Sequence, residues 1–195
     1  MNKSIYLVIT MVFFFGLGAN WVIQKANSSH TIPEIKLVPN FSFINQDGNL
    51  FSKNNLLEKV TVLDFMFTSC AGPCPIMTNN MTQLYKSFDK VEEVQFLSIT
   101  VDPETDDPKM LKTYASINGV NDERWQFLTS DIESIKNLKR DGFMLYADEL
   151  PQGHAIKFVL IDQSGVIRKY YDGTEKTSMA VLKKDITQLI KEESH

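Results

Sequence analysis

The chain has 195 residues, enough for one globular domain with a sizeable core and some additional sequence. Hydrophobic residues make up 43% and charged residues 23%, which is typical of a folded protein rather than a disordered one. The formal net charge is −4 and no basic stripe is visible, so a nucleic-acid-binding protein is disfavoured. Two cysteines, Cys70 and Cys74, are too few for a disulfide-rich mini-protein or a four-cysteine zinc site.

An uncharged apolar run covers residues 5–23, between Lys3 and Lys25. At ~1.5 Å per residue this run nearly spans a ~30 Å hydrocarbon core, and Trp21 near its end suits the membrane interface. We therefore expect residues 1–24 to form a single N-terminal transmembrane helix. A cleaved secretory signal is the alternative, with small residues near Gly18 at the cleavage site. Both interpretations place the remainder on the exported side, periplasmic or extracytoplasmic.

Residues 25–40 are polar, contain Pro33 and Pro39, and show neither a helical nor a strand period. They are predicted to be a linker between the membrane and a domain that covers residues 41–191, followed by a short tail at 192–195.

The domain begins with strand-like segments. Two short apolar stretches flank Asp47 and Gly48, a dipeptide favoured in two-residue hairpin turns. Residues 60–67 form a nearly continuous apolar run, as expected for a strand covered on both faces. A helix is predicted next, because one of its faces carries Met77, Met81, Leu84 and Phe88.

A strand–helix–strand pattern follows. Residues 94–101 are predicted to be a second buried strand, and residues 125–128 a short third one. Between them, Asp107 and Pro108 are typical of a helix start, with an acidic N-cap and proline at the first helical position.

The sequence pattern of the last third of the chain predicts a helix, a β-hairpin and a final helix. Ser130 and Glu133 fit a capping box. Residues 155–161 and 166–171 are predicted strands joined by a loop with a glycine. The final helix has the apolar face Met179, Leu182, Ile186, Leu189 and Ile190. This succession indicates an α/β, thioredoxin-like domain, although it does not define the strand order.

The two cysteines lie between a predicted buried strand and a helix, and Pro75 is pre-set for the first helical turn. Because the helix N-terminus favours a thiolate, we expect at least one of the two to have a depressed pKa and to be reactive. In an exported protein the pair can also close into a disulfide. A purely structural disulfide is the alternative, but so short a loop would stabilise the fold weakly.

Two neighbouring thiolates are also soft metal ligands, and Cu(I) accepts two or three ligands whereas zinc normally takes four. Of the three histidines, His30 lies in the linker and His195 at the chain end, so His154 remains as a candidate third ligand. The alternative for His154 is an ordinary surface or hydrogen-bonded histidine. Met77 and Met81 are soft ligands too, but their helical spacing favours core packing.

Three segments resemble the signature regions of the Sco/SenC family. They are residues 67–70 with Cys74 and Pro75, residues 101–108, and His154 followed by residues 160–165. The resemblance covers about residues 40–191. It implies a membrane-anchored, thioredoxin-like copper protein that serves assembly of the binuclear copper centre of cytochrome c oxidase. It also implies that Cys70, Cys74 and His154 bind copper, as Cu(I), Cu(II) or both.

The sequence departs from the family pattern at a few positions. Ala71 and Gly72 stand where the family usually has a proline and an acidic residue, and Val159 replaces an aromatic residue. Three acidic residues of the second signature also need an explanation. These residues are Asp102, Asp106 and Asp107. They can orient a metal ligand or form part of a partner surface. Alternatively, Asp107 caps a helix and the other two solvate a turn.

Three functions are compatible with these residues. The first is a copper-binding assembly factor that passes copper to a subunit of cytochrome c oxidase. The second is a thiol-disulfide oxidoreductase in which Cys70 and Cys74 form the redox-active pair and reduce another thiol protein. The third is a redox or copper sensor in which oxidation of the pair blocks metal binding.

Overall fold

The computed structural model describes residues 11–12, 15–16, 18, 31–151 and 156–192. The chain divides into two compact units, residues 1–32 and 33–195. In the first unit, residues 11–12, 15–16 and 18 are helical, and their apolar side chains at Met11, Val12 and Phe15 are exposed. Most of the expected membrane helix lies outside the described residues. Among those that are described, no helix has the length and hydropathy needed to cross a membrane.

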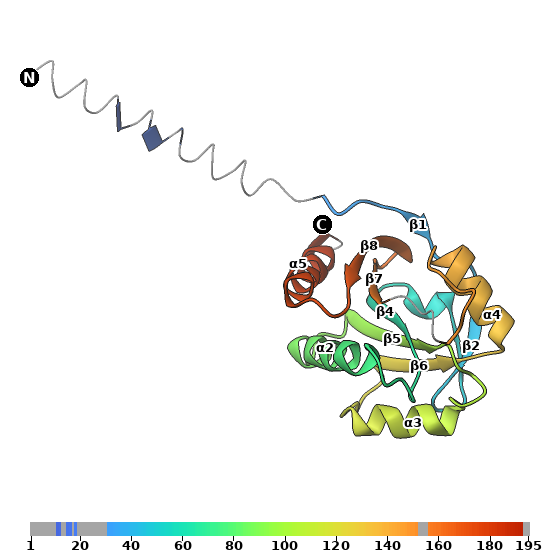
Figure 1. Cartoon of the computed structure of the whole chain (residues 1–195). Helices are drawn as coiled ribbons and strands as arrows, with labels where there is room; N and C mark the ends of the chain where they lie inside the picture. The colour runs from blue at the N-terminus through green and yellow to red at the C-terminus, as the bar shows by residue number, and fades with distance from the viewer. Residues whose placement is uncertain (1–10, 13–14, 17, 19–30, 152–155, 193–195) are drawn as a thin grey trace, which may run out of the picture. The chain divides into compact units, whose positions relative to one another are not determined.

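The second unit is built on an eight-stranded sheet in the order β1-β8-β7-β4-β5-β6-β2-β3 (Figure 1). Strands β4, β5 and β6 are parallel to one another, and the other pairings are antiparallel. The strands are β1 (Lys36–Leu37), β2 (Ser42–Asn45), β3 (Leu50–Ser52), β4 (Val60–Met66), β5 (Val94–Thr100), β6 (Trp125–Thr129), β7 (Lys157–Ile161) and β8 (Val166–Asp172). The helices are η1 (Lys53–Leu56), α2 (Cys74–Ser87), α3 (Pro108–Ile117), α4 (Ile132–Asn137), η2 (Leu138–Gly142) and α5 (Lys176–Glu192).

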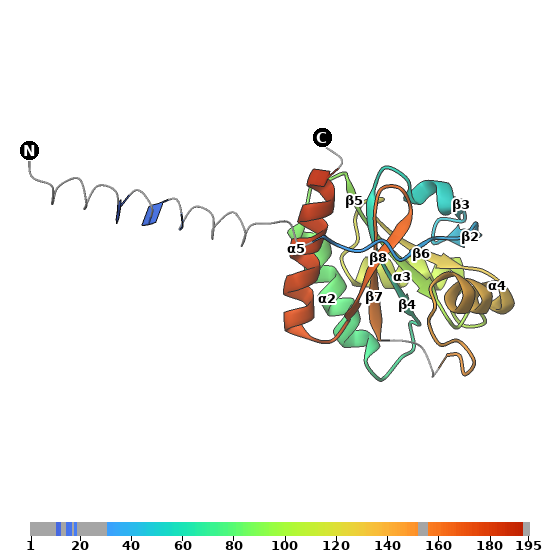
Figure 2. The ribbon, with the colours of Figure 1, turned by 90° about the horizontal axis from the view of Figure 1, so that it is seen from above.

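Strand β4 is central, as its continuous apolar sequence predicts. All seven of its residues are buried, and Leu63 is paired with Leu97 of β5 on one side and Val159 of β7 on the other. Burial on both faces follows because helices cover both faces of the sheet. Helices α2, α3 and α5 lie on one face and α4 on the other, as Figures 1 and 2 show together.

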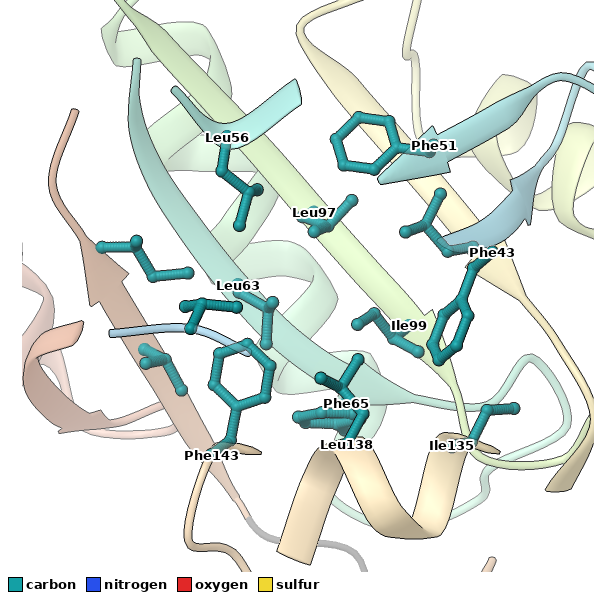
Figure 3. Packing of buried hydrophobic residues seen from close by; sticks show 14 of the residues in the cluster. Phe43, Phe51, Leu56, Leu63, Phe65, Leu97, Ile99, Ile135, Leu138 and Phe143 are labelled. Carbon is teal, nitrogen blue, oxygen red and sulfur yellow. The ribbon is translucent and has the colours of Figure 1, made fainter. Parts of the chain in front are cut away.

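The core on the α4 face is aliphatic and aromatic (Figure 3). Phe65 of β4 meets Phe143 edge to face, with the ring centroids 5.6 Å apart. Leu97 and Ile99 of β5 and Ile135 of α4 belong to the same buried cluster. This packing fixes the end of β4, from which the chain continues into the cysteine segment.

The core on the opposite face contains the residues that α2 was expected to bury. Met77 and Met81 are fully buried, which confirms their interpretation as core residues. Tyr85 of α2 packs against Phe96 and Trp125, with centroid distances of 5.8 and 5.7 Å. This aromatic group holds α2 against β5 and β6.

Two local predictions differ from the structure. The N-cap of α4 is Asp131, whose carboxylate accepts a hydrogen bond from Ser134 N at 2.9 Å, so the capping box expected at Ser130 is wrong by one residue. The prediction that residues 25–40 are only a linker is also wrong in part. Lys36 and Leu37 of this segment form strand β1, which pairs with β8. A strand of two residues is too short to show alternation in the sequence.

Candidate metal centre

The cysteines lie where β4 gives way to α2. Strand β4 ends at Met66, and Cys74 is the first residue of α2, which confirms that the cysteines lie between a buried strand and a helix with Pro75 in its first turn. Neither cysteine is in a disulfide. Cys70 is partly exposed and receives a hydrogen bond from Gly72 N at 3.4 Å, whereas Cys74 is buried. The site therefore combines one accessible and one buried sulfur.

The buried thiol does not have the depressed pKa that we expected of a cysteine at a helix start. Burial raises the pKa of Cys74, and the neighbouring Cys70 thiol and Asp64 carboxylate raise it further. Desolvation penalises the thiolate more than the helix N-terminus favours it. At Cys74 the expectation of a depressed pKa is therefore wrong. A metal ion that binds there must displace the thiol proton.

Asp64 of β4 is a buried acid on the sheet face that α2 covers. It is 2% exposed, and Ser98 Oγ donates a hydrogen bond to its Oδ1 at 2.6 Å. Trp125 Nε1 in turn donates to Ser98 Oγ at 3.0 Å. Burial raises the pKa of Asp64 to about 7. Our sequence analysis missed this residue, although a single acid inside an otherwise apolar strand is a detectable signal.

Asp106 fixes the segment that leads into the cysteines. It is fully buried, and its carboxylate accepts hydrogen bonds from Thr68 N at 3.0 Å, from Thr68 Oγ1, and from Thr100 Oγ1 at 2.6 Å. The carboxylate thus ties the start of the cysteine segment to the end of β5. Because its side chain is buried, Asp106 is not part of a partner surface.

The neighbouring acids have local roles. Asp107 caps α3, and its side chain accepts a hydrogen bond from Met110 N at 2.7 Å, which confirms the predicted cap. The backbone N–H of Asp102 donates to Thr100 Oγ1 at 3.0 Å, so Asp102 takes part in the turn that follows β5.

His154, the third residue expected at the site, lies outside the described residues. Within the described part of the chain, no group of three His, Cys, Asp or Glu side chains is arranged to hold a metal ion. Strand β7 is antiparallel to β4, so its start at Lys157 lies at the same end of the sheet as the cysteine segment. Ala71 and Gly72, two departures from the family pattern, are exposed beside the cysteines.

The fold and the dithiol define a class of protein. A central strand of a mixed sheet leads into a helix that begins at a buried cysteine, with an accessible cysteine four residues earlier. This is a thioredoxin-like domain with a cysteine pair placed to bind a soft metal ion or to exchange disulfides. The family model described as SCO1/SenC matches residues 29–191. The chain belongs to the SCO1/SenC family.

Individual relatives agree with this assignment. The chain is 37% identical over 145 residues to a SCO1 protein homolog of Bacillus subtilis, covering 70% of this chain and 74% of the relative. The solved structure of BsSco, a Sco-family cytochrome c oxidase assembly protein in which a disulfide switch was identified, is 30% identical with a TM-score of 0.73. That match covers 83% of this chain and 98% of BsSco. Copper-bound yeast Sco1 is 26% identical with a TM-score of 0.64, covering 78% and 90%.

Proposed function

We propose that this protein binds copper and delivers it to the copper-receiving subunit of cytochrome c oxidase during assembly of the enzyme. The observation that carries the proposal is a pair of reduced cysteines, one at the start of α2 and one four residues before it, in a chain of the SCO1/SenC family. Two sulfur atoms that lie close together are a soft ligand set, and Cu(I) accepts so small a set. Copper is the cargo of the protein, held by Cys70 and Cys74 and completed by His154.

The difference in burial between the two sulfurs supports transfer of copper to a partner rather than storage of copper. Cys74, the first residue of α2, is buried, while Cys70 is partly exposed beside Gly72. An incoming ligand reaches Cys70 first, so copper exchanges its ligands in sequence and is never released into solution. The imidazole of His154 is a normal copper ligand and favours Cu(II), which two thiolates alone hold less well. The start of β7 near the cysteine segment supports this role.

Anchoring to a membrane belongs to the same proposal. The helical residues 11–12 and 15 carry exposed apolar side chains within an uncharged run, which supports a membrane helix. The domain of residues 33–195 then lies on the exported side, where a dithiol is exposed to oxidation.

The test is a copper titration of the reduced full chain with metal-ligand assignment by X-ray absorption. We expect one copper ion per chain and no binding after oxidation of Cys70 and Cys74 to a disulfide, because the disulfide consumes both thiolates. His154→Ala should weaken Cu(II) binding at least ~10-fold and leave Cu(I) binding to the two sulfurs. Equal copper uptake by the oxidised chain, or unchanged Cu(II) affinity in His154→Ala, contradicts the proposed site.

A second function, thiol-disulfide exchange, is favoured by the same geometry. An accessible sulfur can attack a partner disulfide, and a buried sulfur nearby can resolve the mixed disulfide. His154 separates the two functions because only copper transfer requires the imidazole. If His154→Ala retains the wild-type rate of reduction of a model disulfide and its Cu(II) affinity is also unchanged, the oxidoreductase function is the better description.

A further inference from the structure

A hollow lies beside Cys70, between helices α2 and α3. Its volume is about 430 Å³. We call it the α2–α3 groove and define it by six lining residues: Cys70, Thr78, Thr82, Lys86, Tyr114 and Ile117. Both helices lie on the same face of the sheet (Figure 1). Because Thr78, Thr82 and Lys86 follow one another along α2, the groove runs along this helix away from the cysteine pair.

The floor of the groove is held in place by hydrogen bonds. The hydroxyl groups of Thr78 and Tyr114 are 2.8 Å apart and join the two helices. The Tyr114 ring packs edge to face on Phe127 of β6, with the centroids 6.0 Å apart. Because the helices are tied together by these contacts, the groove is formed before any partner arrives, which lowers the entropic cost of binding.

The groove has the length and polarity for an extended peptide. From Pro75 to Lys86, α2 rises ~16 Å at ~1.5 Å per residue, which equals about five residues of extended chain. The Asn79 side chain borders the groove and makes no hydrogen bond with any residue the structure describes. Its amide can therefore donate to or accept from a peptide backbone.

One charged and one exposed apolar side chain distinguish the groove beyond Cys70. Among the described residues that line it, Lys86 is the single charged one, and it forms no ion pair with any of the described residues. Ile117 is 77% exposed, an unusual position for a large apolar side chain at the rim of a groove. A matching segment would carry an apolar residue in its middle and an acidic residue at its far end.

We propose that the α2–α3 groove binds an extended segment of the partner that receives copper. The segment places a cysteine at Cys70, an apolar side chain over Ile117, and Asp or Glu opposite Lys86, about five residues from the cysteine. This inference rests on the proposed copper transfer and identifies how the partner is recognised. In the exchange the partner thiol loses its proton as its sulfur bonds to Cu(I). Cys70 takes up a proton as its bond to copper breaks, and the oxidation state of copper does not change.

The experiment measures the rate of Cu(I) transfer from the reduced, copper-loaded full chain to synthetic peptides. The first probe is acetyl-Gly-Cys-Ser-Leu-Ser-Gly-Glu-amide, and the second replaces its Glu by Lys. At low ionic strength we expect wild type to transfer copper about fivefold faster to the Glu peptide, since one exposed ion pair contributes at most ~1 kcal/mol. Lys86→Glu should reverse this preference, and Ile117→Glu should slow transfer to both peptides.

Copper affinity should be unchanged in both variants, because neither residue is a metal ligand. Lys183→Glu, the same charge change at an exposed position of α5, is the matched control and should behave as wild type. If Lys86→Glu and Lys183→Glu change transfer equally, net charge alone acts and the groove proposal is overturned. Transfer without any peptide preference overturns it too and leaves copper transfer intact. A wild-type chain that binds no copper overturns the proposed function and the groove together.

Discussion

Asp106 holds the start of the cysteine segment through its hydrogen bonds to Thr68. Its buried carboxylate accepts three hydrogen bonds, from Thr68 N, Thr68 Oγ1 and Thr100 Oγ1. Asp106→Leu leaves these donors unpaired, and each buried unpaired group costs ~1–3 kcal/mol. We expect a loss of several kcal/mol in the free energy of unfolding and a copper affinity lowered at least ~10-fold, because the cysteine segment is no longer fixed. Urea unfolding and competition with a Cu(I) chelator measure these effects.

Asp106→Asn keeps an acceptor for the backbone N–H of Thr68 and should recover most of the copper affinity. Asp107→Ala is the matched control, since it removes the adjacent acid and the α3 cap and should cost only ~1 kcal/mol, with no change in copper affinity. A folded Asp106→Leu protein with the copper affinity of wild type would show that Asp106 does not position the site.

Asp64 makes the stability of the fold depend on pH. Its pKa is about 7 in the folded protein against 3.8 for an unperturbed carboxyl, so between pH 4 and 7 the folded state retains a proton that the unfolded state has lost. The free energy of unfolding should therefore fall as pH rises through this window, by about 4 kcal/mol. Asp64→Asn removes this decrease, and the variant should be more stable than wild type above pH 7 and similar to it at pH 4.

Chemical denaturation at several pH values checks this behaviour. Glu104→Gln, a neutralised acid at an exposed position, should follow wild type throughout. Parallel stability curves for wild type and Asp64→Asn would mean that Asp64 ionises in the folded state as it does in the unfolded one.

At the scale of elements, the short η2 helix carries a buried lysine. Lys139 is fully buried, its Nζ makes no hydrogen bond with any residue that the structure describes, and it lies 5.5 Å from the centroid of the Phe65 ring. Burial lowers the pKa of Lys139 to about 8. From pH 8 to about 10.5 the unfolded state binds the proton and the folded state does not, so stability rises with pH.

Lys139→Met keeps the length of the side chain and removes the charge. We expect the variant to be more stable than wild type at pH 7, by up to ~3 kcal/mol, and to lack the rise in stability above pH 8. Thermal unfolding at pH 7 and pH 9.5 measures both. Lys183→Met on the exposed face of α5 should leave the stability nearly unchanged. A destabilised Lys139→Met protein would show that the ammonium group has a favourable partner.

The elements also show which features a sequence reveals. The nearly continuous apolar run of residues 60–67 and the helical spacing of Met77 and Met81 predicted β4 and α2, because both patterns arise from contacts with a core. The strand order could not be predicted from the sequence, since it depends on contacts between residues that are far apart in sequence. At the site, the cysteine pair was predicted from local spacing. The raised pKa of Cys74 was not predicted, because it depends on burial by the whole fold.

For the whole molecule, the proposed anchor defines on which side of the membrane the domain lies. In a Cys70→Ser/Cys74→Ser background, a cysteine introduced by Ser28→Cys should react with a membrane-impermeant thiol reagent in intact cells or spheroplasts. Lys3→Cys is the matched control on the other side of the uncharged run, and it should react only after lysis. Labelling of the Ser28→Cys chain only after lysis would place the domain in the cytosol.

The edges of the described sheet are short. Strand β1 has two residues and lies between Pro33 and Pro39, which lack backbone N–H donors, and β3 has only three residues. Edge strands with many unpaired backbone groups are templates for pairing between chains, and short edges remove most of that template. Copies of this domain that are crowded together therefore have little tendency to join edge to edge and aggregate, and each domain remains accessible from solution.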